Sequence, residues 1–511
     1  MFNNLLLDID AGTIDWSRAQ FALTAIYHWL FVPLTLGLAV IMGIAETKYY
    51  LSKDAFWKET AMFWQRLFGV NFAMGVATGI ILEFEFGTNW SNYSWFVGDI
   101  FGAPLAVEGI VAFFMESTFV AVMFFGWKKV SAGFHLASTW LTGLGATISA
   151  WWILVANAWM QYPVGCEFNP DTMRNEMVSF AEVALSPFAV SKFCHTVTSS
   201  WIIGAIFCVG VCCWYLMKKR HTRLAVESLK IGAGVGLVAA LLAAATGHKS
   251  GMDVAEVQPM KLAAMEALYD GGNEVGLKMV EGIEIPYGLS IMATNDPKGY
   301  VPGINDILNG YTDNNGKVEP SVDEKIERGK KAIEALANYR AAKFASSDDG
   351  TAAAYNLGIL KENMQYFGYG YVKDKNDVVP PVAVNFWAFR VMVGVGCLFI
   401  AFFAIVLAMV YRWPRFLFAK RDITALPAWH YWLAILLIPL GYIGSESGWL
   451  VAEFGRQPWT IQDMLPTWVA VSDLQSSSVI ITFFLFLILF STMLAVEINI
   501  LLKQIKKGPA L

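Results

Sequence analysis

Charged residues are scarce in this sequence. Only 15% of its 511 residues are Asp, Glu, Lys or Arg, whereas 56% are hydrophobic. Soluble globular proteins carry about 25% charged residues, so the chain is clearly depleted in them. Apolar runs recur along it, and many are as long as the roughly 20 residues that a helix needs to cross a bilayer. The composition therefore excludes a single water-soluble core and predicts a polytopic membrane protein.

Several common signals are also missing. The N-terminus has no basic segment before its first apolar run, 21–45, which is too long for the core of a cleaved secretory signal. The six cysteines form no Cys-x-x-Cys-His motif, so covalent attachment of c-type haem is not expected. Cys208 and Cys212, one helical turn apart in an apolar run, are interpreted as packing residues. The net charge of −5 does not suggest a nucleic-acid partner.

Nine apolar segments predict an all-α membrane protein with about nine transmembrane helices. The segments are 21–45, 63–86, 101–126, 134–160, 187–217, 230–247, 385–411, 428–446 and 468–502. The chain then divides into three regions. Helices one to six occupy 1–247, a long external loop occupies 248–384, and helices seven to nine occupy 385–511.

Basic residues are distributed unevenly between the loops. Alternate loops and the C-terminal tail carry Lys48, Lys53, Lys58, Lys128, Lys129, Lys218, Lys219, Arg220, Arg223, Lys230, Arg412, Arg415, Lys420, Arg421, Lys503, Lys506 and Lys507. The opposite short segments carry only Arg18, Arg174, Lys192 and Arg456. Because cytoplasmic loops are enriched in Lys and Arg, we expect the C-terminus in the cytoplasm and the N-terminus outside. That orientation requires an odd number of helices.

The connection 248–384, between the sixth and seventh segments, is long and hydrophilic. A connection of this length is usually functional or disordered rather than a simple linker. Pro259 has the position of a first-turn proline in a short helix. Ser321 and Glu324 have the spacing of a capping box that begins a charged helix ending at about residue 344. The helix count places this partly ordered region on the outer, periplasmic side.

Ionisable and ligand-forming residues of the predicted helices gather at one depth. Buried charges are costly in a membrane, so each one suggests a function. At 1.5 Å per residue, most of them lie about two turns from the outer boundary or in the adjoining loop. They are His28, Glu108, His195, Arg390, Met392, Glu453 and Arg456, whereas Glu116 lies deeper. Structural polar groups placed independently would have no reason to share that depth.

His, Met and carboxylate side chains can all supply axial ligands to haem iron. A His and Met pair saturates the iron for electron transfer, whereas a single ligand leaves a position open for O2. Each residue also has an ordinary interpretation, because a buried His or Met is often a packing residue. Glu108 could likewise form a structural ion pair with Arg390. The spacing of the residues leaves both interpretations open.

The positions of the six histidines exclude two other classes of haem protein. His135, His221 and His430 fall at or near the predicted cytoplasmic side, and His248 begins the external loop. A haem–copper oxidase needs a cluster of ligand histidines in its helices, which these positions cannot supply. A four-helix cytochrome b with bis-His ligation needs two histidines on one helix, and no predicted segment holds two.

Long blocks of the sequence resemble the larger subunit of the cytochrome bd quinol oxidases, over essentially the whole chain. They include SRAQFALTAIYHWLFVPLTLGLA around His28, KFCHTV around His195, KLAAME, FWAFRVMVG around Met392, and GWLVAEFGRQPW. The last block, with its ending GRQPW, is highly specific on its own. Eight such blocks occur in the order that the family has.

This resemblance implies an oxidase that carries two haem b groups, one low-spin and one high-spin, and one haem d. His195 and Met392 would be the axial ligands of the low-spin haem b, with Arg390 near its propionates. His28 and Glu453 would ligate the two high-spin irons, and which of these is haem d stays open. Arg456 would assist the haem propionates at the oxygen site.

The resemblance also implies routes for protons and quinol. Glu108 would lie at the O2-reducing site, and Glu116 would belong to a proton route from the cytoplasm, together with Ser117 and Ser149. Lys261 and Glu266 would bind quinol in the external loop. From the sequence alone, these last two residues could equally be solvated charges on a helix. Because quinol would release protons outside, a membrane potential would arise without a pump.

The implied partners are a second oxidase subunit, small single-helix accessory subunits, quinol, O2 and the lipid of a bacterial inner membrane. Two other functions fit parts of the sequence. A secondary transporter would show repeats and broken helices, and neither is evident in the sequence. A non-catalytic haem scaffold would need no iron with an open coordination position.

Overall fold

The computed structural model describes residues 10–280, 282–344, 350–413 and 422–509. Within these ranges, nine helices are long and apolar enough to cross a membrane, which confirms the predicted all-α polytopic fold. They are α1 (Ala11–Ser52), α2 (Ala55–Thr88), the third span Gly98–Phe125, α6 (Ala132–Gln161), α8 (Pro187–Met217), α9 (Thr222–Val257), α15 (Val382–Tyr411), α17 (Ala428–Phe454) and α19 (Ser476–Lys507). Arg415, Lys420 and Arg421, which contribute to the predicted orientation, lie outside the described residues.

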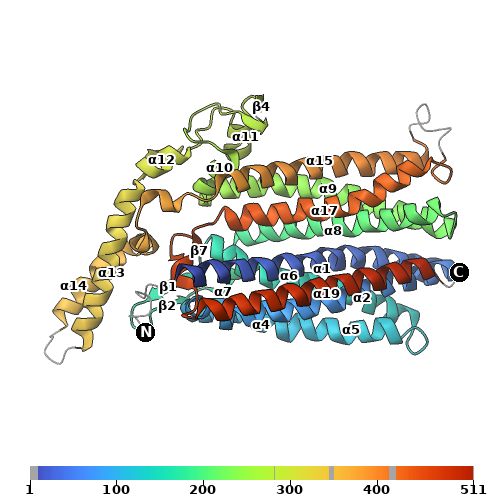
Figure 1. Ribbon diagram of the computed structural model, residues 1–511, viewed down its shortest axis with the longest axis horizontal. Coiled ribbons are helices and arrows are strands. Elements are labelled where there is room, and N and C mark those ends of the chain that lie inside the picture. Colours follow the sequence, from blue (N-terminus) through green and yellow to red (C-terminus); the bar gives the residue numbers. More distant parts are fainter. Residues whose placement is uncertain (1–9, 281, 345–349, 414–421, 510–511) are drawn as a thin grey trace.

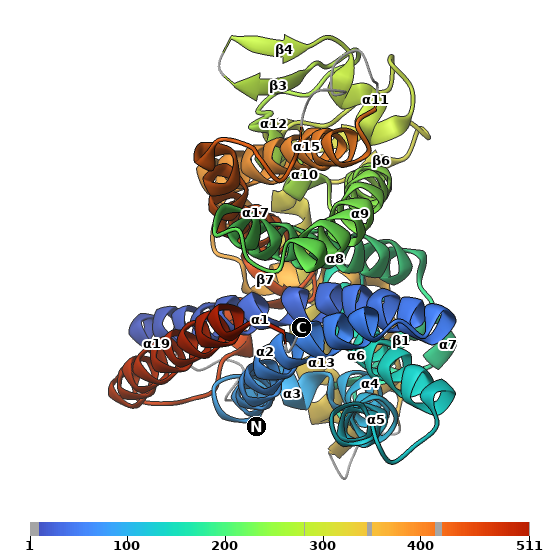
Figure 2. The same ribbon diagram turned by 90° about the vertical axis from the view of Figure 1, so that its right-hand side faces the viewer.

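The spanning helices run side by side as one elongated bundle (Figure 1). The two termini lie at opposite ends of the bundle, as an odd number of spans requires. Seen from the end, α1, α2, α6 and the third span form one group, and α8, α9, α15 and α17 form a second (Figure 2). α19 packs on the outside of the first group, against α1 and α2.

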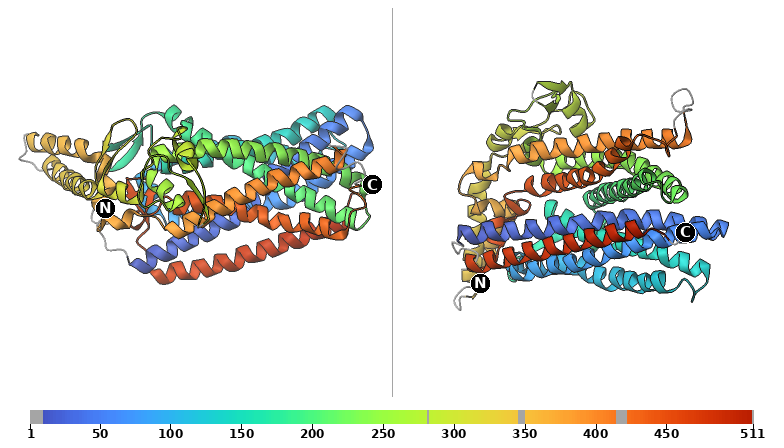
Figure 3. Two further views of the ribbon diagram at one scale, coloured as in Figure 1. Left: turned by 90° about the horizontal axis from the view of Figure 1, so that it is seen from above. Right: turned by 45° about the vertical axis from the view of Figure 1, so that its right-hand side comes forward.

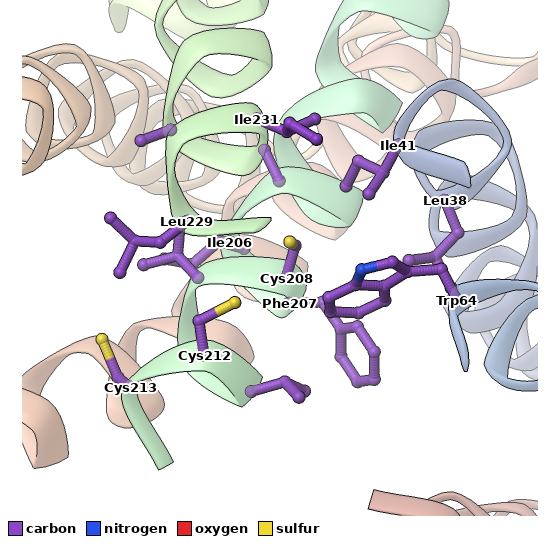
Figure 4. Close-up of a cluster of buried hydrophobic side chains, with 14 of the residues drawn as sticks. Leu38, Ile41, Trp64, Ile206, Phe207, Cys208, Cys212, Cys213, Leu229 and Ile231 are labelled. Carbon is purple, nitrogen blue, oxygen red and sulfur yellow. The ribbon is translucent and has the colours of Figure 1, made fainter. Parts of the chain in front are cut away.

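The two groups meet where α1 packs against α8. A Cβ atom added to Gly37 of α1 would lie 2.5 Å from the Cα atom of Gly204 of α8, so the two backbones are in contact. Small residues permit this close approach between membrane helices. Around it lies the largest cluster of buried side chains, to which Leu38 and Ile206 belong (Figure 4). Cys208 and Cys212 are also buried in this cluster, as expected of packing residues.

Two helices continue beyond the C-terminal ends of their apolar runs. α9 continues to Val257 rather than to 247, because polar residues in its last turns bond to each other along the helix. The Lys249 Nζ atom, for example, lies 2.5 Å from the Asp253 carboxylate one turn later. α17 runs to Phe454 rather than to 446, so Glu453 belongs to the last helical turn and not to the predicted loop.

The ninth span begins at Ser476 rather than at 468. The residues before it form β7 (Trp459–Ile461), β8 (Leu465–Pro466) and α18 (Thr467–Ala470). Short elements also fill the loops after α2 and α6, namely α3 (Ser91–Phe96), β1 (Cys166–Asn169), β2 (Arg174–Met177) and α7 (Phe180–Ala184). These elements lie at the end of the bundle where α1 begins, and they cover the ends of the helices.

The long loop is folded, and it lies at the end of the bundle opposite to the C-terminus (Figure 3). Its elements are α10 (Pro259–Glu266), β3 (Leu277–Val280), β4 (Ile283–Ile285), α11 (Gly288–Thr294), α12 (Ile304–Asn309), β5 (Tyr311–Thr312), β6 (Val318–Glu319), α13 (Val322–Phe344), α14 (Thr351–Asn363), η3 (Met364–Tyr371) and η4 (Lys375–Val378). Pro259 occupies the first turn of α10 as predicted. The Ser321 hydroxyl accepts a hydrogen bond from the backbone N–H of Glu324 at 3.2 Å, as a cap of α13 should.

Candidate active site

His195 projects from α8 toward α9. Its Nδ1 atom lies 3.1 Å from the carbonyl oxygen of Ala243 and 3.2 Å from the Thr246 hydroxyl. Because a carbonyl can only accept, Nδ1 carries the proton and the lone pair of Nε2 stays available. A Cβ atom added to Gly247 would lie 3.1 Å from the Cε1 atom of His195. A glycine therefore keeps the space beside this imidazole open.

Met392 lies on α15 and faces α17. A Cβ atom added to Gly448 of α17 would lie 3.0 Å from the Met392 sulfur. α8, which carries His195, packs against α9 and α17, and α15 packs against the same two helices. His195 and Met392 thus belong to one four-helix group, and a glycine lies beside the imidazole of the first and the sulfur of the second.

His28 shows the same arrangement in the other group of helices. Its Nδ1 atom lies 2.9 Å from the hydroxyl of Thr78 on α2. That hydroxyl donates its own hydrogen to a backbone carbonyl, either Met74 at 3.0 Å or Gly75 at 3.1 Å. With that hydrogen on a carbonyl, the hydroxyl accepts from Nδ1 of His28, and the Nε2 lone pair is available. Gly79 lies beside the ring, since its added Cβ atom would be 3.1 Å from Cε1.

Glu453, which is partly buried, and Arg456, which is buried, form an ion pair at the C-terminal end of α17. Arg456 also donates to the carbonyl oxygen of Thr460, which fixes the guanidinium against the following loop. The second carboxylate oxygen of Glu453 accepts a hydrogen bond from the Asn157 side chain at 3.0 Å. Asn157 in turn accepts a hydrogen bond from the ammonium group of Lys192. The sequence analysis did not select Asn157 or Lys192, because nothing in the chain order links α6 and α8 to the end of α17.

Lys261 of the external loop reaches the same cluster. Its ammonium group donates to the side-chain oxygen of Gln161 at 2.5 Å and to that of Gln258 at 2.7 Å. The side chain is 3% exposed, and this burial lowers the pKa of Lys261 well below its usual range, an effect that the nearby Lys192 increases. The interpretation of Lys261 as a solvated helix charge is therefore wrong. Three basic side chains, Lys192, Lys261 and Arg456, share this region with the carboxylate of Glu453.

Glu266 is buried too, and it pairs with Arg390 of α15 at 2.7 Å. Burial raises the pKa of Glu266 to about 7, although the Arg390 guanidinium acts in the opposite direction. Arg390 also donates to the carbonyl oxygens of Met265 and Lys278. The alternative ion pair between Glu108 and Arg390 is therefore not formed. Arg390 connects the external loop to the bundle instead.

Glu108 and Glu116 lie along the third span, on the side that faces α6. This span consists of α4 (Gly98–Val107), the π-helical turn η2 (Glu108–Phe113) and α5 (Phe114–Phe125). Glu108 begins the π-helical turn and accepts a hydrogen bond from the Ser149 hydroxyl of α6 at 2.5 Å. A Cβ atom added to Gly145 of α6 would lie 2.6 Å from the Glu116 side chain. Ser117, by contrast, is exposed on α5, so the structure does not bring it toward Glu116.

A second buried polar cluster lies near the other end of the bundle. The Glu46 carboxylate of α1 lies 2.6 Å from His135 and accepts hydrogen bonds from Thr139 at 2.6 Å and Gln65 at 2.9 Å. The sequence analysis missed Glu46 because the predicted first span ends one residue before it. Its position one residue past a long apolar run was the available signal.

A family model described as cytochrome bd terminal oxidase subunit I matches residues 16–509. The chain belongs to this family. Cytochrome bd-II ubiquinol oxidase subunit 1 of Escherichia coli (strain K12) is 38% identical over 97% of both chains. Cytochrome bd ubiquinol oxidase subunit 1 of Bacillus subtilis (strain 168) is 33% identical over 96% of this chain and 93% of that protein.

A solved structure has the same fold. The bd oxidase from Geobacillus thermodenitrificans aligns with a TM-score of 0.76 at 23% identity, over 97% of this chain and 99% of that one. The chain is therefore a multi-pass subunit of a terminal oxidase of the bacterial inner membrane, and the family is one of haem proteins.

The residues present fit haem as a cofactor of this oxidase subunit. His28 and His195 both have a free Nε2 lone pair, the atom with which a neutral imidazole binds iron. Both imidazoles and the Met392 sulfur have a glycine where a side chain would otherwise fill the space. The buried basic residues around Glu453 suit anionic propionates, which favour Arg and Lys partners. Three separate features of the chain therefore agree with a haem protein.

Proposed function

We propose that this subunit oxidises quinol at the outer side of the membrane and passes the electrons to O2, which is reduced to water. The observation that carries the proposal is the pair of histidines, His28 and His195. Each is held through Nδ1 by an acceptor on a neighbouring helix, and each keeps Nε2 free. They lie in different helix groups, which suits two separate redox centres in one chain. A non-catalytic scaffold would need only one of them.

The proposed ligand set follows from these positions. His195 and Met392 would hold the low-spin haem b, and His28 and Glu453 would each hold one of the two high-spin irons, one of haem b and one of haem d. These haems supply one-electron transfer and the O2-binding iron when they are bound. Arg456 orients Glu453 through their ion pair and offers its positive charge to propionates.

The proposed quinol site lies where the external loop meets the bundle, at Lys261 and Glu266. A small cavity adjoins Lys261, between the end of α9, η3 and the loop after α17. It is lined in part by Gln258, Tyr369, Trp459, Gln462 and Asp463. Glu266, with a pKa of about 7, is suited to accept a proton from a quinol hydroxyl at neutral pH. Lys261 is also connected to Glu453 through the side chain of Gln161.

Protons for water formation are proposed to enter from the cytoplasm and to pass Glu116 before they reach Glu108. Both carboxylates face α6, and Ser149 bonds to Glu108 directly. Quinol protons leave outside while the consumed protons enter from inside, so the reaction generates a membrane potential without a pump. The N-terminus is then periplasmic and the C-terminus cytoplasmic. A second subunit and small single-helix accessory subunits complete the proposed complex.

The test is to measure haem content, quinol reduction and O2 consumption on the same purified variants. His195→Ala or Met392→Leu should remove the low-spin haem b spectrum. His28→Ala or Glu453→Ala should perturb the high-spin haems and stop O2 reduction, while quinol still reduces the low-spin haem. If His28→Ala consumed O2 at the wild-type rate with all haems present, the proposed oxygen site would be wrong. An unchanged low-spin spectrum in both His195→Ala and Met392→Leu would exclude that ligand pair.

A further inference from the structure

The hairpin of β3 and β4 exposes an apolar surface although it belongs to the external loop. Together with the start of α11 it exposes Met279, Val280, Ile283, Ile285, Tyr287 and Ile291, with Ile283 60% exposed. A two-stranded hairpin is only marginally stable in water unless one face packs against something. A contiguous apolar patch on a soluble surface usually marks an interaction site. Among the described residues, nothing covers this patch.

The two faces of the hairpin differ in chemistry. Its register pairs Leu277 with Ile285, Lys278 with Glu284, and Val280 with Ile283. Because side chains alternate between faces along a strand, Ile283 and Ile285 share one face, and Glu284, opposite Lys278, lies on the other. The hairpin is therefore amphipathic, with an apolar face and a charged face.

The height of the hairpin along the bundle is fixed by Arg390. The Arg390 guanidinium of α15 donates to the backbone carbonyl of Lys278 at 2.5 Å. Arg390 lies eight residues after Val382, the first residue of α15, or about 12 Å along the helix axis. Trp387, one turn before Arg390, is exposed on the same helix, and exposed Trp residues mark the membrane–water interface. The hairpin is thus level with the first part of the membrane-spanning helix α15, as Figure 1 shows.

We propose that the two strands of this hairpin, β3 and β4, dock into the outer leaflet of the bilayer beside α15. The apolar face of the hairpin contacts the boundary between headgroups and acyl chains, and the face with Lys278 and Glu284 points away from it. The depth is limited to this boundary, since the outer edges of a two-stranded hairpin have backbone groups that hydrocarbon cannot satisfy. The patch thereby gains the apolar partner that neither the loop nor the bundle provides. The inference does not depend on which residues bind quinol.

The test uses the complete oxidase in lipid nanodiscs. In a Cys166→Ser, Cys397→Ser background, Ile283→Cys is labelled with bimane, and its fluorescence is compared between phosphatidylcholine with and without brominated acyl chains. Bromine quenches the fluorophore on contact, so we expect emission to fall about twofold or more in the brominated lipid. Val280→Cys, which is paired with Ile283 across the hairpin and therefore shares its face, should respond in the same direction. It provides a second reading if Ile283→Cys alters the hairpin.

Tyr355→Cys is the matched control, because Tyr355 is a 70% exposed side chain of the same loop, on α14 at the far end of the molecule. Its label should be unaffected by bromine. Equal emission in both lipids for the labels at 283 and 280 would overturn the proposal. It would also be overturned if these labels escaped quenching while a photo-crosslinker at 283 captured the second subunit. That result would make the patch a subunit interface.

Discussion

At the scale of single residues, hydrogen bonds determine which side-chain atom is free to bind a ligand. In His195 a backbone carbonyl and in His28 a threonine hydroxyl hold Nδ1, and both leave Nε2 free. Second-sphere partners of this kind fix the tautomer and the ring orientation of metal-binding histidines. Thr78 can act so because its own hydrogen is already used along α2. The role of each histidine thus depends on residues that no local motif around it contains.

The sequence could indicate candidate site residues better than it could predict the partners of those residues. His28, His195 and Met392 stand out as ligand-forming groups at one depth of apolar runs. Lys192 and Asn157 do not, because they become neighbours of Glu453 only after α6, α8 and α17 pack together. Arg390 illustrates the same limit. Its depth was predictable, whereas its ion pair with Glu266 depends on a loop that folds back onto α15.

Glu266 provides a prediction about pH. Its pKa is raised to about 7 by burial, so the carboxyl becomes protonated as the pH falls below about 7 and can no longer accept a proton from quinol. We expect kcat/KM for quinol to decrease on the acidic side of pH 7. Glu266→Gln should lower kcat/KM by roughly 100-fold or more and remove this acidic limb, while Glu266→Asp should keep it.

The measurement is quinol oxidase activity between pH 5.5 and 8.5 with the haem spectrum recorded on each sample, a window of about 1.5 units around the expected pKa. The oxidation of an artificial donor that does not need the external loop is the control. If Glu266→Gln kept the wild-type pH profile, the carboxyl would not be the proton acceptor. Glu266 would then serve only to anchor Arg390.

At the scale of the elements, helix number and order were predictable, whereas helix ends were not. An apolar run indicates only the part of a helix that contacts lipid. The hydrogen-bonded helix continues beyond this part where polar side chains form hydrogen bonds or ion pairs. α9 continues through Lys249 and Asp253, and α17 continues to the ion pair of Glu453 with Arg456. The π-helical turn that begins at Glu108 was also not predictable, because it depends on how the third span packs against α6. Such turns are frequent at functional sites.

The contact between α1 and α8 provides a prediction about stability. A Cβ atom added to Gly204 would lie 2.4 Å from the backbone of Gly37, so Gly204→Ala forces the two helix groups apart. We expect a loss of about 1–3 kcal/mol, seen as a lower temperature of half-maximal haem loss in the detergent-solubilised complex. Gly234→Ala on α9 is the matched control, because its added Cβ meets nothing within 4 Å.

The control should be neutral or slightly stabilising, since Ala exceeds Gly in helix propensity by about 1 kcal/mol. Equal thermal stability of the Gly204→Ala and Gly234→Ala variants would show that the approach of α1 to α8 is not tight in the assembled oxidase. The glycine pair would then have no role in joining the helix groups.

At the scale of the whole molecule, chemistry is distributed unequally between the two ends of the bundle. The candidate quinol residues, the Glu453 cluster and the folded loop all lie at the end opposite to the C-terminus. The turns after α1 and α8, with Lys53, Lys218 and Lys219, lie at the C-terminal end. A reaction that releases protons at one end and consumes protons from the other needs this polarity.

The polarity leads to a prediction about orientation. Cytoplasmic loops are enriched in Lys and Arg, so the end with the C-terminus should face the cytoplasm and the folded loop should face outward. In the Cys166→Ser, Cys397→Ser background, Tyr355→Cys should react with a membrane-impermeant maleimide in spheroplasts. Leu51 lies near the C-terminal end of α1 and is 75% exposed. Leu51→Cys should therefore react with the maleimide only in inverted vesicles. Both sites should react after solubilisation, which establishes that each thiol is accessible.

Labelling of Leu51→Cys in intact spheroplasts would reverse the topology. Quinol would then be oxidised on the cytoplasmic side, and turnover could no longer generate the proposed membrane potential by moving the consumed protons inward past Glu116 and Glu108.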